Sequence, residues 1–331
     1  MASEKIRICK RCVLPESLPD IWLDETEVCN ICRQQEKQTD PEFLETDFIK
    51  IINKYKGQRK YDCLVMCSGG KDSTSALYYM KKRYHLNPLA FTFDHGFENP
   101  DALENIKNAV NILGIDHVFL NSEEMHDAFR EIVESELKAV ICHICSIWYM
   151  RAAFKLAIKH KIPLIIAGWT KGQSIKHSGR YSEKIGEYGS MAKATKDFIE
   201  SFMSKQEKYK NFPASIEEAT KQARKKMDFV VMSPHWFLPF GEEENEELIK
   251  KELNWKLPKQ SYPKGSTNCF LNYISVLGSM KNYGYTHYHV ELSKLIREGQ
   301  ISREDALEKL KIDFDQELLD STYKKLKGDN K

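Results

Sequence analysis

The hexapeptide Ser68-Gly69-Gly70-Lys71-Asp72-Ser73 combines residue types that are suited to holding phosphate groups. Its consecutive glycines allow successive backbone N–H groups to turn toward one anion. A helical pattern follows, and a helix N-terminus adds further N–H donors and the positive end of the helix dipole. Lys71 supplies a positive charge, whereas Asp72 is expected to cap the helix or to help hold Mg²⁺. We therefore expect this loop to bind the phosphates of ATP.

The spacing within the hexapeptide excludes two common phosphate-binding patterns. It lacks the G-x-x-x-x-G-K-[ST] of a Walker A loop and the G-x-G-x-x-G of a dinucleotide-binding loop. The simplest alternative is a polar glycine turn between a strand and a helix that binds no ligand.

The segment from Ser68 to Ser73 resembles the PP-loop of the N-type ATP pyrophosphatases, the group that contains GMP synthetase, argininosuccinate synthetase and the tRNA thiolation enzymes. The resemblance implies that ATP is cleaved between its α- and β-phosphates, that AMP is transferred to a substrate oxygen, and that a nucleophile then displaces AMP. It also implies catalytic roles for Lys71 and Asp72, a ribose or Mg²⁺ contact from Asp94, and a nucleotide or substrate contact at Gly168.

Six of the nine cysteines fall into three C-x-x-C pairs, which indicates metal or redox chemistry. Cys9 and Cys12 are separated from Cys29 and Cys32 by sixteen residues. This spacing is typical of four thiolates around a structural Zn²⁺, with no coordination position left for catalysis. Four free cysteines are the alternative.

Cys142 and Cys145 form the third pair, at the entrance to a predicted helix whose N-terminus is expected to lower the thiol pKa. Together with the distant Cys269, the pair resembles the three-cysteine [4Fe-4S] site of some tRNA thiolation enzymes. That resemblance implies one iron that is free to carry sulfur. The pair alternatively holds zinc with His143, forms a redox couple, or supplies a single nucleophile.

A second resemblance extends over nearly the whole chain. The segments 9–15, 29–33, 162–166 and 296–307 are similar to bacterial N-acetyl sugar amidotransferases of surface-polysaccharide pathways. These enzymes convert an acetamido group of a sugar into an acetamidino group with ammonia from a partner glutaminase. The segment Gly168-Trp169-Thr170-Lys171-Gly172-Gln173 departs from their pattern.

Three functional hypotheses follow, and the first is ATP-dependent amide transfer to an amino sugar or another amide-bearing small molecule. The chain has no recognisable glutaminase residues, so nitrogen must come from a separate protein. The second hypothesis is [4Fe-4S]-dependent thiolation of tRNA or a small molecule, with sulfur from a donor protein. The third is a zinc-ribbon module that senses nucleotide without catalysis.

Short apolar runs alternate with helical patterns through the middle of the chain, which predicts a mostly parallel sheet with helices on both faces. The resemblance implies a Rossmann-like fold of the adenine nucleotide alpha hydrolase type. The predicted strands are 63–67, 89–93, 117–120, 162–167 and 229–232, and the predicted helices are 43–52, 74–82, 99–113, 147–160, 245–253, 276–281, 291–298, 303–310 and 315–326. Residues 172–190 are expected to form a mobile loop over the site.

These patterns divide the chain into a zinc-ribbon-like module (1–42), a PP-loop domain (43–240) and a helical region (241–331). The 331 residues are 41% hydrophobic and 30% charged, as in soluble globular proteins, and the net charge of +2 provides no general attraction to nucleic acid. We find no secretory leader and no apolar stretch of about 20 residues. We therefore expect a cytoplasmic protein, with an oligomer as its assembly.

Overall fold

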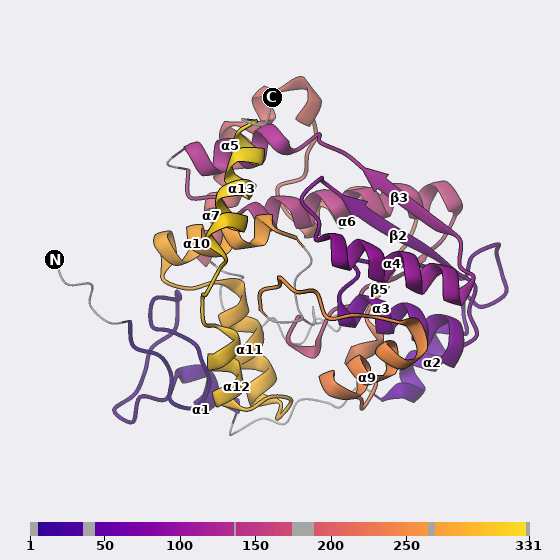
Figure 1. Cartoon of the computed structure of the whole chain (residues 1–331), viewed down its shortest axis with the longest axis horizontal. Helices are drawn as coiled ribbons and strands as arrows, with labels where there is room; N and C mark the ends of the chain where they lie inside the picture. Colours follow the sequence, from indigo (N-terminus) through magenta and orange to yellow (C-terminus); the bar gives the residue numbers. More distant parts are fainter. Residues whose placement is uncertain (1–5, 36–43, 136, 174–188, 264–268, 329–331) are drawn as a thin grey trace.

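The computed structural model describes residues 6–35, 44–135, 137–173, 189–263 and 269–328, and it contains a five-stranded sheet, which lies in the right half of the view in Figure 1. The strands are β1 (Cys63–Met66), β2 (Pro88–Asp94), β3 (His117–Asn121), β4 (Leu164–Ile166) and β5 (Val230–Met232). Their order is β3-β2-β1-β4-β5, and all four pairings are parallel. The strand order reverses between β1 and β4, which makes this place the topological switch point of the sheet. In such parallel sheets ligands bind in a crevice at the carboxyl ends of the strands beside the switch point.

Strand β1 is buried on both faces, so its side chains show how the helices are layered. Cys63 and Val65 pack with helices α2 (Glu45–Ile52), α3 (Lys71–Tyr78), α4 (Pro100–Leu113) and α9 (Glu242–Leu253). Leu64 and Met66 pack with α6 (Ile141–His160) and α8 (Ile216–Arg224) on the other face. The alternation has the two-residue period of a strand, and it confirms the predicted parallel sheet with helices on both faces.

A second group of helices lies beside the sheet and has its own apolar cluster. It comprises α5 (His126–Glu134), α7 (Gly189–Ser201), α10 (Leu271–Tyr283), α11 (His287–Arg297), α12 (Arg303–Lys309) and α13 (Gln316–Lys327). Figure 1 shows the N-terminal segment with α1 (Asn30–Gln35) beside α11 and α12. The Arg303 guanidinium donates to the Cys12 carbonyl oxygen at 2.9 Å, which ties that segment to α12.

The five predicted strands are confirmed, but the helix predicted over 147–160 begins earlier, at Ile141. Residues 141–146 are mostly β-branched residues and cysteines with low intrinsic helix propensity, and burial of their apolar side chains outweighs that preference. Cys142 and Cys145 consequently lie within the first turns of α6. Most of the predicted 172–190 loop lies outside the described residues. The three-part division of the chain stays a prediction.

Helix α6 is long and apolar enough to cross a membrane by length and composition alone. In the structure its apolar side chains pack against β1, α8 and α10.

Candidate active site

The predicted phosphate loop connects β1 to α3, which begins at Lys71. Gly69 has a φ of +84°, and a Cβ atom there would lie 2.1 Å from the Ala102 carbonyl oxygen, so the position requires glycine. The Ser68 N–H donates to Ser73 Oγ at 3.1 Å, and the two hydroxyl oxygens lie 3.0 Å apart. These contacts close the loop on itself at the N-terminus of α3, and a helix N-terminus is a favourable place for an anion.

The end of β4 passes directly against this loop. A Cβ atom at Gly168 would lie 2.4 Å from both the backbone nitrogen and the Cα of Ser73. Gly168 therefore permits a contact that no larger residue allows, and it brings the segment Gly168–Gln173 to the phosphate loop.

Lys71 and Asp72 have different surroundings. The Lys71 side chain is 3% exposed, and its Nζ lies 2.8 Å from Asp72 Oδ2 and 3.6 Å from Glu242 Oε1. Burial alone would lower the pKa of Lys71, but the carboxylates of Asp72 and Glu242 outweigh it and raise that pKa. Asp72 lines the cavity at the loop, whereas the Lys71 ammonium group lies among carboxylates. The catalytic role of Lys71 stays a prediction.

Asp94 ends β2, and its carboxylate is engaged locally. Oδ1 accepts from the Gly96 N–H at 2.6 Å, and Oδ2 accepts from Asn121 Nδ2 at 2.9 Å. Its predicted contact with ribose or Mg²⁺ stays a prediction.

One cavity of about 330 Å³ joins the phosphate loop to the three distant cysteines. The loop residues Ser68, Gly70, Asp72 and Ser73 line one part of it. Cys142, Cys145 and Cys269 line another part, together with His95 and Glu98. Residues that span some two hundred positions of sequence therefore line one cavity together with the predicted ATP site.

The three cavity cysteines are half-buried, and desolvation of their thiols is the main cause of their high pKa values. It raises the pKa of Cys142 to about 11, and it raises the pKa of Cys145 and Cys269 well above the ordinary thiol value. The prediction that the helix N-terminus lowers the pKa of this pair is wrong, because burial of the thiols outweighs the helix dipole. Negative charge on neighbouring thiols and on Glu98 raises the pKa of Cys269 further.

This donor set fits a cationic metal group. Three half-buried thiols and a carboxyl group face one cavity, so ionisation of all of them requires positive charge between them. The residues present therefore suit the predicted [4Fe-4S] cluster.

His95 and Glu98 continue the chain beyond β2, and sequence reasoning missed Glu98. His95 Nε2 lies 3.3 Å from Glu98 Oε1 and 3.3 Å from Cys269 Sγ. Burial raises the pKa of Glu98 well above the usual carboxyl value. Because ligands bind outside the carboxyl ends of parallel strands, the position of Glu98 four residues after β2 was the available signal.

Glu291 on α11 is a second cavity residue that sequence reasoning missed. Thr170 Oγ1 donates to Glu291 Oε1 at 2.9 Å, and Gln173 Nε2 donates to Glu291 Oε2 at 3.1 Å. A Cβ atom at Gly172 would lie 2.7 Å from the Glu291 carbonyl oxygen. The segment that departs from the amidotransferase pattern is thus arranged around this carboxyl. Burial raises the pKa of Glu291 to about 7.

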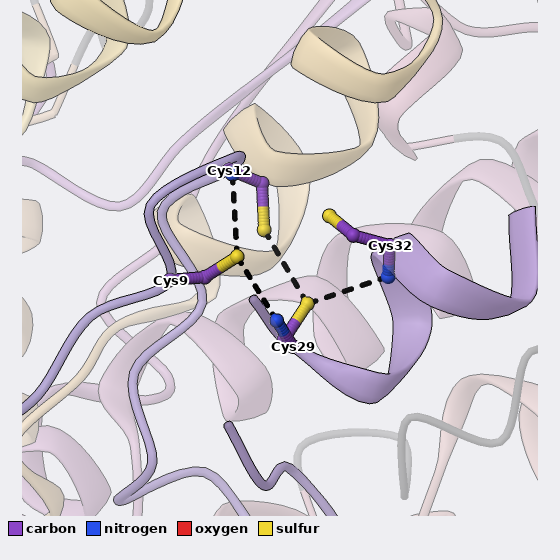
Figure 2. A group of neighbouring side chains, drawn as sticks. All are labelled: Cys9, Cys12, Cys29 and Cys32. Carbon is purple, nitrogen blue, oxygen red and sulfur yellow. Dashed lines mark hydrogen bonds between the residues drawn. The ribbon is translucent and has the colours of Figure 1, made fainter. Parts of the chain in front are cut away.

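The four N-terminal cysteines form a separate group, and Figure 2 shows their sulfur atoms pointing toward one another. All four are buried, and their sulfur atoms lie within 4.8 Å of one another. The Cys29 N–H donates to Cys9 Sγ at 3.2 Å, and the Cys32 N–H donates to Cys29 Sγ at 3.4 Å. Such N–H donors stabilise thiolates, so the geometry suits the predicted Zn²⁺.

No model of a known protein family matches the chain. The uncharacterized protein MJ1599 of Methanocaldococcus jannaschii is 24% identical over 260 residues, which cover 78% of this chain and 76% of that protein. The structure of the U34-tRNA thiolase NcsA from Methanococcus maripaludis, solved with its [4Fe-4S] cluster, gives a TM-score of 0.37 at 17% sequence identity. The match covers 94% of this chain and 91% of the NcsA chain. NMN synthetase from Francisella tularensis gives a TM-score of 0.40 at 11% sequence identity, and the match covers 86% of this chain and 97% of the synthetase chain.

The parallel sheet order, with a glycine loop between β1 and α3, defines a Rossmann-like α/β fold.

Proposed function

We propose that this chain is an ATP-dependent sulfur transferase, which adenylates an amide-type oxygen of its acceptor and then replaces AMP with sulfur. The observation that carries the proposal is the single cavity that contains both the phosphate loop and the thiols of Cys142, Cys145 and Cys269. A tRNA base or a small amide-bearing molecule is the acceptor class, and a sulfur-donor protein or free hydrosulfide supplies the sulfur.

The first half-reaction uses the phosphate loop. Backbone N–H groups at the start of α3 hold the phosphates of ATP, and Asp72 helps to hold Mg²⁺. The acceptor oxygen attacks the α-phosphorus, the bond to the β-phosphate oxygen breaks, and pyrophosphate leaves. An amide oxygen is a poor leaving group, and adenylation converts it into AMP, which leaves readily.

The second half-reaction uses the cysteine side of the cavity. Cys142, Cys145 and Cys269 would hold a [4Fe-4S] cluster, which supplies a metal position for the sulfur to be transferred. The chain's own part is to keep three thiolates together in a buried cavity and to place the acceptor carbon between them and the phosphate loop.

We also propose that Cys9, Cys12, Cys29 and Cys32 hold a structural Zn²⁺. Four thiolates complete a tetrahedral site, so this metal would stabilise the N-terminal segment and take no part in the reaction.

The test is anaerobic reconstitution with iron and sulfide, followed by iron and sulfide analysis. We expect about four of each per chain in the wild type, and loss of both in Cys142→Ala, Cys145→Ala and Cys269→Ala. Cys63→Ala is the matched control, since Cys63 is buried in the other apolar cluster beside α3. Its cluster content should equal that of the wild type.

Transfer itself is tested with MgATP, hydrosulfide and unfractionated tRNA, with thionucleosides measured by mass spectrometry and AMP by chromatography. AMP release that requires hydrosulfide and the three cysteines supports sulfur transfer. A metal-free protein that releases AMP with ammonia and an acetamido sugar would overturn it in favour of amide transfer.

A further inference from the structure

The segment that follows β2 is tied to the segment that precedes α10. The Phe270 N–H donates to the Phe97 carbonyl oxygen at 2.9 Å, and Glu98 pairs with Cys269 in an antiparallel bridge. Backbone pairing therefore fixes the Glu98 carboxyl beside the Cys269 thiol. The two positions are 171 residues apart in the sequence.

Glu98 faces the cavity, and its side chain is 13% exposed. The ligand atoms of His95, Glu98 and Cys269 all lie within 4.8 Å of one another. A carboxylate held this close to a buried thiolate is repelled by it unless a cation lies between them. The two groups can therefore ionise together only around a cation, which makes both of them candidate ligands of one metal group.

His95 is already engaged through both ring nitrogens. Its Nδ1 accepts from the Phe97 N–H at 3.3 Å, so the ring proton lies on Nε2. Nε2 is then a donor, and it faces Glu98 Oε1 and Cys269 Sγ, each at 3.3 Å. A histidine that donates its N–H to two ligands positions them and is not itself a ligand.

The other cysteine of the cavity lining does not provide a fourth thiolate. Cys67 directly follows β1, and its side chain packs in the apolar cluster of α3 and α4, on the sheet face opposite α6. Among the described residues, Glu98 places a carboxylate oxygen within 4.8 Å of the Cys269 sulfur and so offers an anionic donor there.

We propose that Glu98 is the fourth protein ligand of the metal group held by Cys142, Cys145 and Cys269, with His95 as its positioning residue. The inference rests on the proposed function for the identity of the cluster. A carboxylate binds iron less tightly than a thiolate does. Hydrosulfide can therefore take the position of Glu98 without any change in oxidation state, and the released carboxylate keeps its hydrogen bond to His95 Nε2.

The test compares the wild type with Glu98→Ala, Glu98→Gln and Glu98→Asp after iron and sulfide reconstitution. We expect all of them to retain iron, because the three thiolates remain. The EPR spectrum of the reduced cluster should change in Glu98→Ala and Glu98→Gln and return toward the wild-type spectrum in Glu98→Asp. Hydrosulfide should bind Glu98→Ala more tightly than the wild type, because no carboxylate competes for the same metal position. Glu104→Gln, on the exposed side of α4, is the matched control.

Identical spectra and identical hydrosulfide titrations in the wild type and Glu98→Ala would overturn the inference. Cobalt(II) binding distinguishes failure of this inference from failure of the proposed function. The absorption spectrum of cobalt-loaded Cys142→Ala is subtracted from that of each other protein, which removes the contribution of cobalt at the four N-terminal cysteines. A wild type that takes up no iron but shows cobalt bands that depend on Glu98 would refute the cluster and keep Glu98 as a ligand. Cobalt bands that are the same without Glu98 would refute the ligand. If His95→Ala retains iron and shows the same change in the EPR spectrum as Glu98→Ala, that result would support a role of His95 in positioning Glu98.

Discussion

Thr170 and Glu291 are separated by 120 intervening residues, and their side chains form a hydrogen bond of 2.9 Å at the cavity that joins the phosphate loop to the cysteines. Gln173 donates to the same carboxyl at 3.1 Å. The segment after β4 therefore buries an acid and holds it in one orientation. That arrangement has a measurable consequence for the pH dependence of stability.

The first prediction concerns Glu291, whose pKa burial raises from 4.5 to about 7. Below pH 4.5 the carboxyl is protonated in both the folded and the unfolded chain, so it has no effect. As the pH rises from about 4.5 to about 7 the unfolded chain ionises first, and the free energy of unfolding falls by about 3 kcal/mol.

Glu291→Gln should lack this fall, so it should be more stable than the wild type at pH 8 and lose that advantage near pH 4.5. Urea unfolding across this range measures the difference. Glu243→Gln, on the exposed surface of α9, is the control and should follow the wild type at every pH. If the free energy of unfolding depends on pH in the same way in Glu291→Gln and in the wild type, the raised pKa of the Glu291 carboxyl is refuted.

The second prediction concerns the two glycines that permit close backbone approach. In Gly69→Ala and Gly168→Ala the new methyl group meets backbone atoms at 2.1 and 2.4 Å, so the phosphate loop must shift. We expect a loss of about 1–3 kcal/mol in stability and about a tenfold or greater loss in MgATP affinity. Calorimetric titration with MgATP measures the affinity.

Gly278→Ala is the control for both variants. Gly278 lies within α10, and a Cβ atom there meets no atom within 4 Å. Alanine at this position should leave MgATP binding unchanged and raise the stability slightly, because glycine is unfavourable inside a helix. Unchanged MgATP affinity in Gly69→Ala would refute the assignment of the loop.

The strands and the glycine loop were predictable because their signals are local. A continuous apolar run such as Cys63–Met66 identifies a buried strand, and adjacent glycines before a helix identify a tight turn. Glu291 has no local signal, since it is a single acid in a chain with 48 acidic residues, and the place of Glu98 after a predicted strand does not by itself distinguish it from other acids. Their places in the cavity depend on how α10 and α11 pack against the sheet, which no short-range pattern encodes.

The same limit explains the wrong pKa prediction for Cys142. A position near the start of a helix can be inferred from sequence, and its dipole effect follows. Burial of the thiol depends on the packing of α6 against α10, where the Cys142 thiol donates to Asn272 Oδ1 at 3.5 Å. Burial has the larger effect, and it acts in the opposite direction.

The third prediction concerns the four N-terminal cysteines and their link to α11 and α12. The Val13 N–H donates to Ser293 Oγ at 3.2 Å, and the Arg303 guanidinium donates to the Cys9 and Cys12 carbonyl oxygens. Removing the proposed zinc, by chelation or in Cys12→Ser, should therefore lower the melting temperature and speed amide exchange in α11 and α12. Exchange measured by mass spectrometry should leave β1 and β2 unchanged.

Zinc content is measured on the same samples, and Cys63→Ala should retain the wild-type amount. A Cys12→Ser protein that keeps its zinc would contradict the four-cysteine site. A protein that loses zinc without faster exchange in α11 would contradict the link to Ser293 and Arg303.

The fourth prediction compares two lysines that face the same carboxylate. Lys71 Nζ lies 3.6 Å from Glu242 Oε1 in a buried setting, and Lys309 Nζ lies 3.0 Å from Glu242 Oε2 with its side chain 22% exposed. Lys71→Ala leaves Asp72 and Glu242 without the buried cation, so it should cost about 3–5 kcal/mol. Lys309→Ala should cost about 1 kcal/mol or less, because solvent screens that pair. Urea unfolding measures both, and equal losses would show that burial of Lys71 does not decide the strength of its ion pairs.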